Sequence, residues 1–99
     1  MNIDEWAAEQ CGVEVFGNGS FIIGSEHGHS IWIDWTIQDP RCREIVREHF
    51  KIWTYYGSVG TDKMGWVSTS ANNDMAGTYG KTIAEAEIEC ITAIWETSK

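Results

Sequence analysis

The sequence of 99 residues contains no leucine, only one proline and no long apolar run. A membrane-spanning helix needs roughly 20 consecutive apolar residues, so a transmembrane helix is excluded. The N-terminal segment lacks the basic and apolar regions of a secretory signal peptide, and we therefore expect a cytoplasmic protein. Because leucine is absent, aromatic residues must supply core volume, and six tryptophans are present. The length fits one domain over residues 1–99.

Basic residues are missing from positions 1–40, which hold seven acidic ones. The whole chain has 15 acidic and 7 basic residues, a net charge of −8 at pH 7. Most of this surface would repel phosphate backbones, so direct nucleic-acid binding is disfavoured. The charge fits either ordinary solubility or a surface that docks on a basic partner protein. Four of the seven bases lie close together: Arg41, Arg43, Arg47 and Lys51.

Cysteine is scarce and widely spaced: Cys11, Cys42 and Cys90, without a CxxC pair. The odd number and the expected cytoplasmic location argue against a disulfide framework. The missing CxxC argues against a zinc knuckle. Each cysteine falls on the apolar side of a predicted helix, so we expect three buried free thiols.

The clearest local pattern predicts a helix over 82–96. Thr82 followed by Glu85 is a capping box, in which the two residues satisfy free backbone N–H groups at the helix start. An apolar stripe recurs at helical spacing, formed by Ala84, Ile88, Ile91 and Trp95, with Ile83, Cys90 and Ile94 beside it. A second stripe is acidic and contains Glu85, Glu89 and Glu96. We expect Ile91 and Trp95 to be buried against a sheet and the three glutamates to be exposed.

Two more helices and several strands follow from caps, turns and alternation. Asn2 and Asp39 are N-cap residues, Gly12 ends the first helix, and the second runs to about Phe50. Strands are expected at 13–16, 21–24, 31–37, 51–57 and 66–70, with 13–24 as a hairpin and Asp34 on the most buried strand. The predicted fold class is α+β: a mainly antiparallel sheet of four to five strands, packed with N-terminal, middle and C-terminal helices in the order α-β-β-β-α-β-β-α.

Both ends of the chain resemble a known family. The opening IDEWAAEQCGVEV, and the closing GWVSTS with GKTIAEAEIECITAIWE, are similar to the two ends of small phage "ABA sandwich" proteins. The sequence departs from that family at Ile-Glu-Cys and Ile-Trp, where alanines are usual, and over 17–30. The resemblance implies a phage or prophage origin and a sheet packed between helices. It carries no catalytic motif.

Motifs for catalysis or cofactor binding are incomplete. GTYGKT is not a P-loop, because Met75 stands where that motif needs its first glycine. His27 and His29, with Glu26, could contact a metal, but a third preorganised ligand is missing. His49 is expected in the core or at its boundary. No serine lies in a nucleophile-elbow motif, so we expect no enzyme, no cofactor and no functional metal site.

Three aromatic residues, Trp32, Tyr55 and Tyr56, lie beside inward-facing neighbours on predicted strands. Either a helix covers that face of the sheet or the rings are exposed for a partner. We expect coverage, because three helices must pack against the sheet.

Together with the resemblance, these features favour a non-enzymatic, phage-encoded binding protein that inhibits a host defence factor of the anti-CRISPR or anti-restriction type. Acting as a monomer or homodimer, it would mimic DNA and occupy a basic nucleic-acid-binding surface of a host protein. The partner-binding candidates are Glu85, Glu89 and Glu96 on the last helix, with Glu5 and Glu9 on the first. One alternative is a protein that sequesters a host signalling nucleotide through Arg41, Arg43, Arg47 and Lys81. Another is a structural or accessory protein of the phage.

Overall fold

The computed structural model describes residues 1–58, 63–73 and 77–99. Within these ranges the elements follow in the order α-β-β-α-β-β-β-α, which confirms the α+β class. The helices are α1 (Ile3–Cys11), α2 (Pro40–Phe50) and α3 (Ile83–Thr97). The strands are β1 (Ser20–Glu26), β2 (His29–Asp34), β3 (Ile52–Ser58), β4 (Met64–Ser70) and β5 (Thr78–Gly80). β1 and β2 form one antiparallel sheet, and β3, β4 and β5 form another in that order.

Each helix begins at the capping residue that the sequence predicts. The side chains of Asn2, Asp39 and Thr82 accept backbone N–H bonds of 2.8, 2.8 and 3.1 Å at the starts of α1, α2 and α3. Pro40 occupies the first turn of α2, where a missing N–H costs nothing. Gly12 ends α1 at φ 69°, a left-handed conformation that glycine adopts without steric penalty. Local sequence signals therefore set the start of every described helix.

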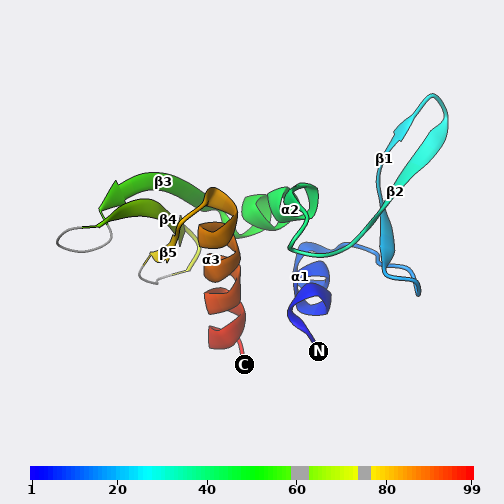
Figure 1. Ribbon diagram of the computed structural model, residues 1–99. Helices are drawn as coiled ribbons and strands as arrows, with labels where there is room; N and C mark the ends of the chain where they lie inside the picture. The colour runs from blue at the N-terminus through cyan, green and yellow to red at the C-terminus, as the bar shows by residue number, and fades with distance from the viewer. Residues whose placement is uncertain (59–62, 74–76) are drawn as a thin grey trace.

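α3 packs on the β3–β4–β5 sheet, and α2 lies between α3 and α1 (Figure 1). Ile91 of α3 is fully buried, and Trp6 of α1 stacks on Phe50 of α2 with ring centroids 5.5 Å apart. On the sheet face that α3 covers, the hydroxyls of Thr54 and Ser68 share a hydrogen bond of 2.6 Å. The core therefore joins the three helices and one face of this sheet. None of the described helices has the length and apolarity to cross a bilayer.

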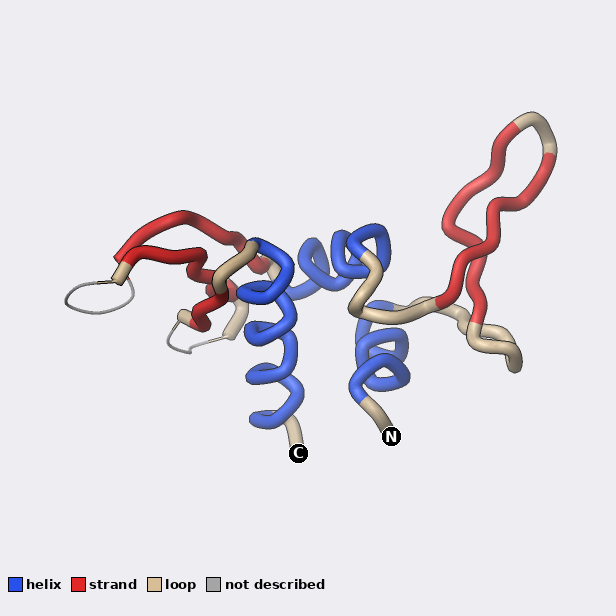
Figure 2. The backbone as a smooth tube through the Cα atoms, viewed as in Figure 1, coloured by secondary structure: helices blue, strands red, loops and turns tan. Residues whose placement is uncertain are grey.

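The β1–β2 hairpin projects from the helices, and we call residues 13–34 the arm (Figure 2). Only its base is anchored: Phe21 packs edge-on against Trp35 at 5.0 Å, and the Trp35 indole donates to the Asp4 carbonyl at 2.7 Å. The Cα radius of gyration is 14.8 Å, against about 12.6 Å for a compact chain of this length. The accessible surface is 6235 Å², against about 5,700 Å² for a compact monomer of this mass. The arm thus leaves more surface uncovered than a compact fold would.

Several strand predictions in the arm are wrong. Residues 13–16 form no strand, and β1 pairs with β2 around a turn at His27 and Gly28, where φ is 50° and 80°. Two successive positive φ values suit a tight hairpin turn. The turn at 17–20 that the predicted hairpin over 13–24 needs is present: the Gly19 N–H donates to the Phe16 carbonyl at 2.8 Å, and Asn18 Oδ1 accepts the backbone N–H of Ser20 at 3.1 Å. The strand predicted over 31–37 ends at Asp34.

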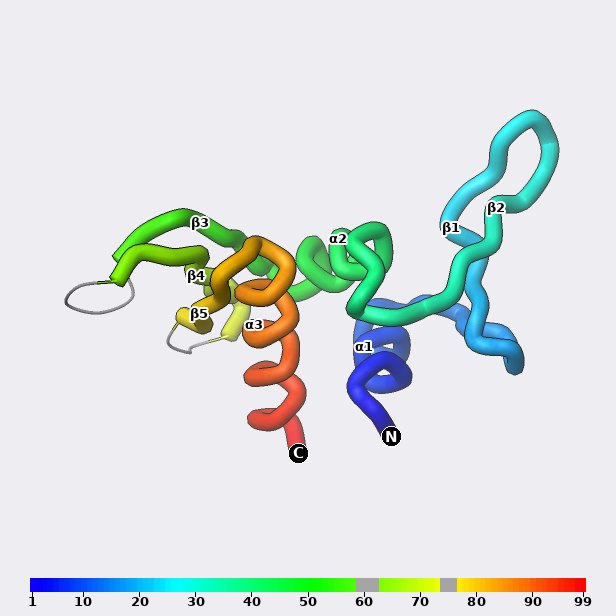
Figure 3. Tube along the Cα trace, viewed as in Figure 1, coloured from blue at the N-terminus to red at the C-terminus, as the bar shows by residue number. Residues whose placement is uncertain are grey.

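The strands also divide differently from the prediction. One sheet of four to five strands was expected, whereas the described strands form a two-stranded and a three-stranded sheet. Figure 3 traces the chain from the arm through α2 into the second sheet, so α2 separates the two. Thr78–Gly80 is a short additional strand, which was not predicted because its sequence is polar and contains glycine.

The buried stripe of α3 is rotated from the predicted one by about a quarter-turn. Ile91 is buried as expected, but Trp95 is only half-buried and Ile83 is 45% exposed. The buried stripe instead runs through Ala86, Glu87, Cys90, Ile91 and Ile94. The sequence analysis placed no acid in this stripe, because the apolar pattern alone cannot identify an acid that has buried cationic partners.

Trp32, Tyr55 and Tyr56 are 49%, 42% and 58% exposed, so the expected coverage by a helix is wrong. Trp32 lies on the arm, which none of the described helices covers. Tyr55 lies on the sheet face opposite α3, and Tyr56 is at the edge strand β3. Asp34 and His49 are also exposed, which corrects their predicted burial. The errors on the strands have one source, the expectation that the helices cover every strand, whereas His49 lies near the end of α2 and faces solvent.

Candidate binding surfaces

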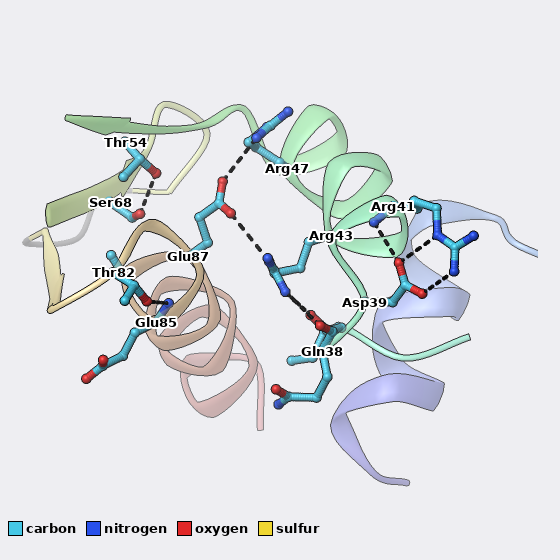
Figure 4. Close-up of polar contacts among 12 residues, drawn as sticks. Gln38, Asp39, Arg41, Arg43, Arg47, Thr54, Ser68, Thr82, Glu85 and Glu87 are labelled. Atoms are coloured by element: carbon cyan, nitrogen blue, oxygen red, sulfur yellow. Dashed lines mark hydrogen bonds and ion pairs between the residues drawn. The ribbon is translucent and has the colours of Figure 1, made fainter. Parts of the chain in front are cut away.

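Glu85, Glu89 and Glu96 form an acidic ridge on α3, and all three side chains are exposed. They lie on the side of the helix opposite the buried stripe, as helical spacing requires. Glu96 pairs with Lys99 at 3.4 Å, whereas no cation of the described residues lies within salt-bridge distance of Glu85 or Glu89. The Glu85 side chain points away from that of Glu87 (Figure 4). The predicted ridge is therefore present and largely uncompensated.

Glu5 and Glu9 lie one turn apart on α1 and line a common hollow of about 440 Å³ beside the start of the arm. Val13, Val15 and Trp35 supply apolar walls to the same hollow, and no lysine or arginine lines it. Within the part of the chain that the structure describes, no hydrogen bond or ion pair joins Glu5 or Glu9 to the acidic ridge. The five predicted acids thus form two separate groups on adjacent helices.

The predicted basic cluster does not converge on a pocket. Arg41 makes a bidentate ion pair with the Asp39 carboxylate, donating from Nε at 3.0 Å and from Nη2 at 2.7 Å (Figure 4). Arg43 and Arg47 both turn toward Glu87 instead. Lys81 is exposed before α3, and the linings of three hollows, of about 560, 440 and 350 Å³, contain no lysine or arginine.

Glu87 is the residue that sequence reasoning missed. It is 4% exposed and accepts from Arg43 Nε at 3.4 Å and Arg47 Nη1 at 3.1 Å. Arg43 is 7% exposed, and its Nη1 also donates to the carbonyls of Ile37 and Gln38 at 3.1 and 3.0 Å. The signal available was an acid in the apolar sector of one helix and two arginines four residues apart on another. This cluster ties α2 to α3 and leaves Arg43 no exposed face for a ligand.

Local charge and burial shift several pKa values. The Arg41 side chain, helped by its backbone N–H, lowers the pKa of Asp39 to about 2. Burial raises the pKa of the Cys11 thiol to about 11, and it also raises the pKa of Cys42 and of Cys90. The three cysteines are free, two buried and Cys11 half-buried, so they are protonated at neutral pH and unreactive as nucleophiles.

The remaining sequence motifs gain no chemistry from the fold. His27 and His29 lie exposed at the tip of the arm, and His27 Nε2 is 3.6 Å from Glu26 Oε1. Over residues 1–58, 63–73 and 77–99, three or more potential metal ligands do not gather anywhere. Met75, the residue that breaks the P-loop pattern, lies outside the described residues.

The outer face of the β3–β4–β5 sheet carries an aromatic surface, of which the sequence analysis identified only Tyr55 as a residue that could be exposed. Trp53 is 54% exposed and stacks on Tyr55 at 5.1 Å. Tyr55 lies over Gly57, and Tyr79 lies over Gly65; a Cβ at Gly65 would be 2.1 Å from the Tyr79 ring. Glycines at these two positions let both rings lie flat on the strands.

Family models, curated proteins and solved structures contain no match to this chain.

Proposed function

We propose that this chain is a non-enzymatic, phage-encoded binding protein that inhibits a host defence factor by occupying a basic, nucleic-acid-binding surface of that factor. The observation that carries the proposal is the acidic ridge of α3, where Glu85 and Glu89 have no cationic partner among the described residues. An exposed, unpaired carboxylate keeps its long-range field, which a basic partner would neutralise.

The charge pairing inside the molecule strengthens this argument. Arg41, Arg43, Arg47 and Lys99 are all engaged by only three acids, Asp39, Glu87 and Glu96. Most of the excess negative charge therefore stays on the surface rather than in internal ion pairs. Along α3 the ridge residues rise by about 6 Å and then about 10.5 Å. These intervals correspond to about every second or third phosphate of a DNA strand.

The proposal is tested with the intact chain as bait in lysate of an infected host, at two salt concentrations. Charge reversal of the ridge (E85K, E89K and E96K together) should abolish capture of the partner, because all three residues are exposed and the fold survives. The matched control reverses Glu14, Glu44 and Glu48, which are also exposed, so its net charge is identical. Equal capture by the two variants, or capture that is insensitive to salt, would remove the ridge as the docking surface.

The alternative of a nucleotide-sequestering protein gains no specific observation, because Arg43 and Arg47 are committed to Glu87. Nucleotide binding predicts absorbance near 260 nm that copurifies with the protein. The bait experiment detects a captured protein instead, and it therefore distinguishes an inhibitor of a host protein from a nucleotide-sequestering protein.

A further inference from the structure

The arm has a hollow of about 560 Å³ between the loop at 16–20 and β2, lined by aromatic and polar groups. Phe16 and Trp32 form two of its walls, with ring centroids 4.9 Å apart and planes crossing at 61°. They are 40% and 49% exposed, which is high for such large apolar side chains. Asp34 and Asn18 line the same hollow.

The Asp34 carboxylate is the only formal charge in this lining, and among the described residues it has no hydrogen-bond or ion-pair partner. Asn18 Oδ1 is already occupied by the backbone N–H and hydroxyl of Ser20, at 3.1 and 2.6 Å. The unused capacity of the hollow is therefore one negative charge beside two aromatic rings.

That combination has one natural occupant. A cation on an apolar stem gains attraction from a ring face and from a carboxylate together, and a guanidinium also stacks on aromatic planes. The arm itself offers no such group, because residues 13–34 contain Glu14, Glu26 and Asp34 but no lysine or arginine. A nucleic acid or an anionic ligand would meet repulsion from the same three acids.

We propose that this hollow binds an arginine side chain of the partner protein, between Trp32 and Asp34. The inference rests on the proposed function, since it supplies a second point of contact for a basic partner. It concerns the arm, however, and involves no residue of the acidic ridge. The arm therefore contributes specificity for a cationic side chain, and the ridge contributes long-range charge.

The test uses the ¹⁵N-labelled full chain and a small probe, so it needs no partner. The Nα-acetyl amide of arginine is titrated, followed by the neutral isostere, the Nα-acetyl amide of citrulline. The Trp32 indole N–H is assigned by its loss in Trp32→Phe, and the Asn18 side-chain amide gives a second signal. We expect saturable, millimolar shifts of both signals with arginine and about two- to fivefold weaker binding of citrulline.

Asp34→Asn is isosteric and should weaken arginine binding about two- to fivefold, to the level of citrulline. Glu26→Gln removes the same charge elsewhere on the arm and should leave the affinity unchanged. Trp32→Phe, read at Asn18, should also weaken binding and covers the case in which Asp34→Asn disturbs the loop. Equal binding of arginine and citrulline, or equal losses in Asp34→Asn and Glu26→Gln, overturns the proposal. Because ridge variants are tested separately, failure here would leave the proposed function standing.

Discussion

The two hairpins of this protein have similar strands and different surroundings. β1 and β2 contain 7 and 6 residues, and β3 and β4 contain 7 each, all paired antiparallel. β4 is covered by α3 on one face and flanked by β5, and its Val67, Ser68 and Ser70 are buried. In β2, Ile31 and Trp32 are 38% and 49% exposed. A two-stranded hairpin alone is only marginally stable, so what covers a strand pair decides its stability.

The largest effect should come from removing Glu87, the buried acid of α3. Glu87→Ala leaves Arg43 buried without its carboxylate partner, and we expect a loss of about 3 kcal/mol or more in unfolding free energy. Glu87→Gln, which keeps an acceptor, should lose less. Glu26→Ala on the exposed arm should change stability by no more than about 0.5 kcal/mol. Urea titrations measure all three variants, and similar losses for Glu87→Ala and Glu26→Ala would contradict the contrast.

An apolar pair tests the same contrast without charge. Ile91 is fully buried under the sheet, so Ile91→Ala should cost about 2–5 kcal/mol through lost burial and a cavity. Ile22 on the arm is 44% exposed, and Ile22→Ala should cost about 1 kcal/mol or less. The same titrations give both values. A loss for Ile22→Ala that matches Ile91→Ala would mean that the arm is packed in solution.

The elements that the sequence predicts well are those with local causes. All three helices begin where Asn2, Asp39 and Thr82 place their caps, because capping depends on neighbouring residues alone. The strands of the arm meet at a turn at His27 and Gly28, and none of the described helices packs on them. The alternation of apolar and polar residues predicts neither feature. A period-2 pattern indicates a strand but does not indicate which layer, if any, lies on it.

The same reasoning separates the predictable part of the candidate site from the rest. Exposed acids at helical spacing identify the α3 ridge directly, since spacing fixes the face. Glu87 belongs to the same helix, but its burial could not be predicted without knowing that it contacts Arg43 and Arg47 on α2. These partners are 44 and 40 residues away in the sequence. The hollow beside Asp34 could not be predicted either, because it forms only where the loop brings Phe16 against Trp32. Pairwise contacts of this range are outside what a single sequence encodes locally.

Hydrogen exchange compares the two hairpins most directly. The amides that pair β3 with β4 should exchange through global unfolding, because α3 covers that sheet. The amides that pair β1 with β2 should exchange through local opening and at least about 100-fold faster. Mass spectrometry of peptides from 20–34 and 64–70 gives both rates. Equal protection would show that the arm opens only with the whole molecule, which would remove the distinction drawn between the hairpins.

The smallest effect is the pH dependence of stability at the start of α2, where Asp39 caps the helix and binds Arg41. The folded pKa of Asp39 is about 2, below its ordinary value of 3.8. A lowered folded pKa contributes stability that is present above pH 3.8 and is lost as the pH falls toward 2. Asp39→Asn should therefore be less stable than the wild type above this window, and the difference should shrink within it. The control Asp34→Asn removes a carboxylate that has no described partner, so at pH 7 its melting temperature should stay close to that of the wild type. Melting temperatures between pH 2 and 7 give the comparison, and parallel curves for wild type and Asp39→Asn would mean that the Arg41 contact does not act in solution.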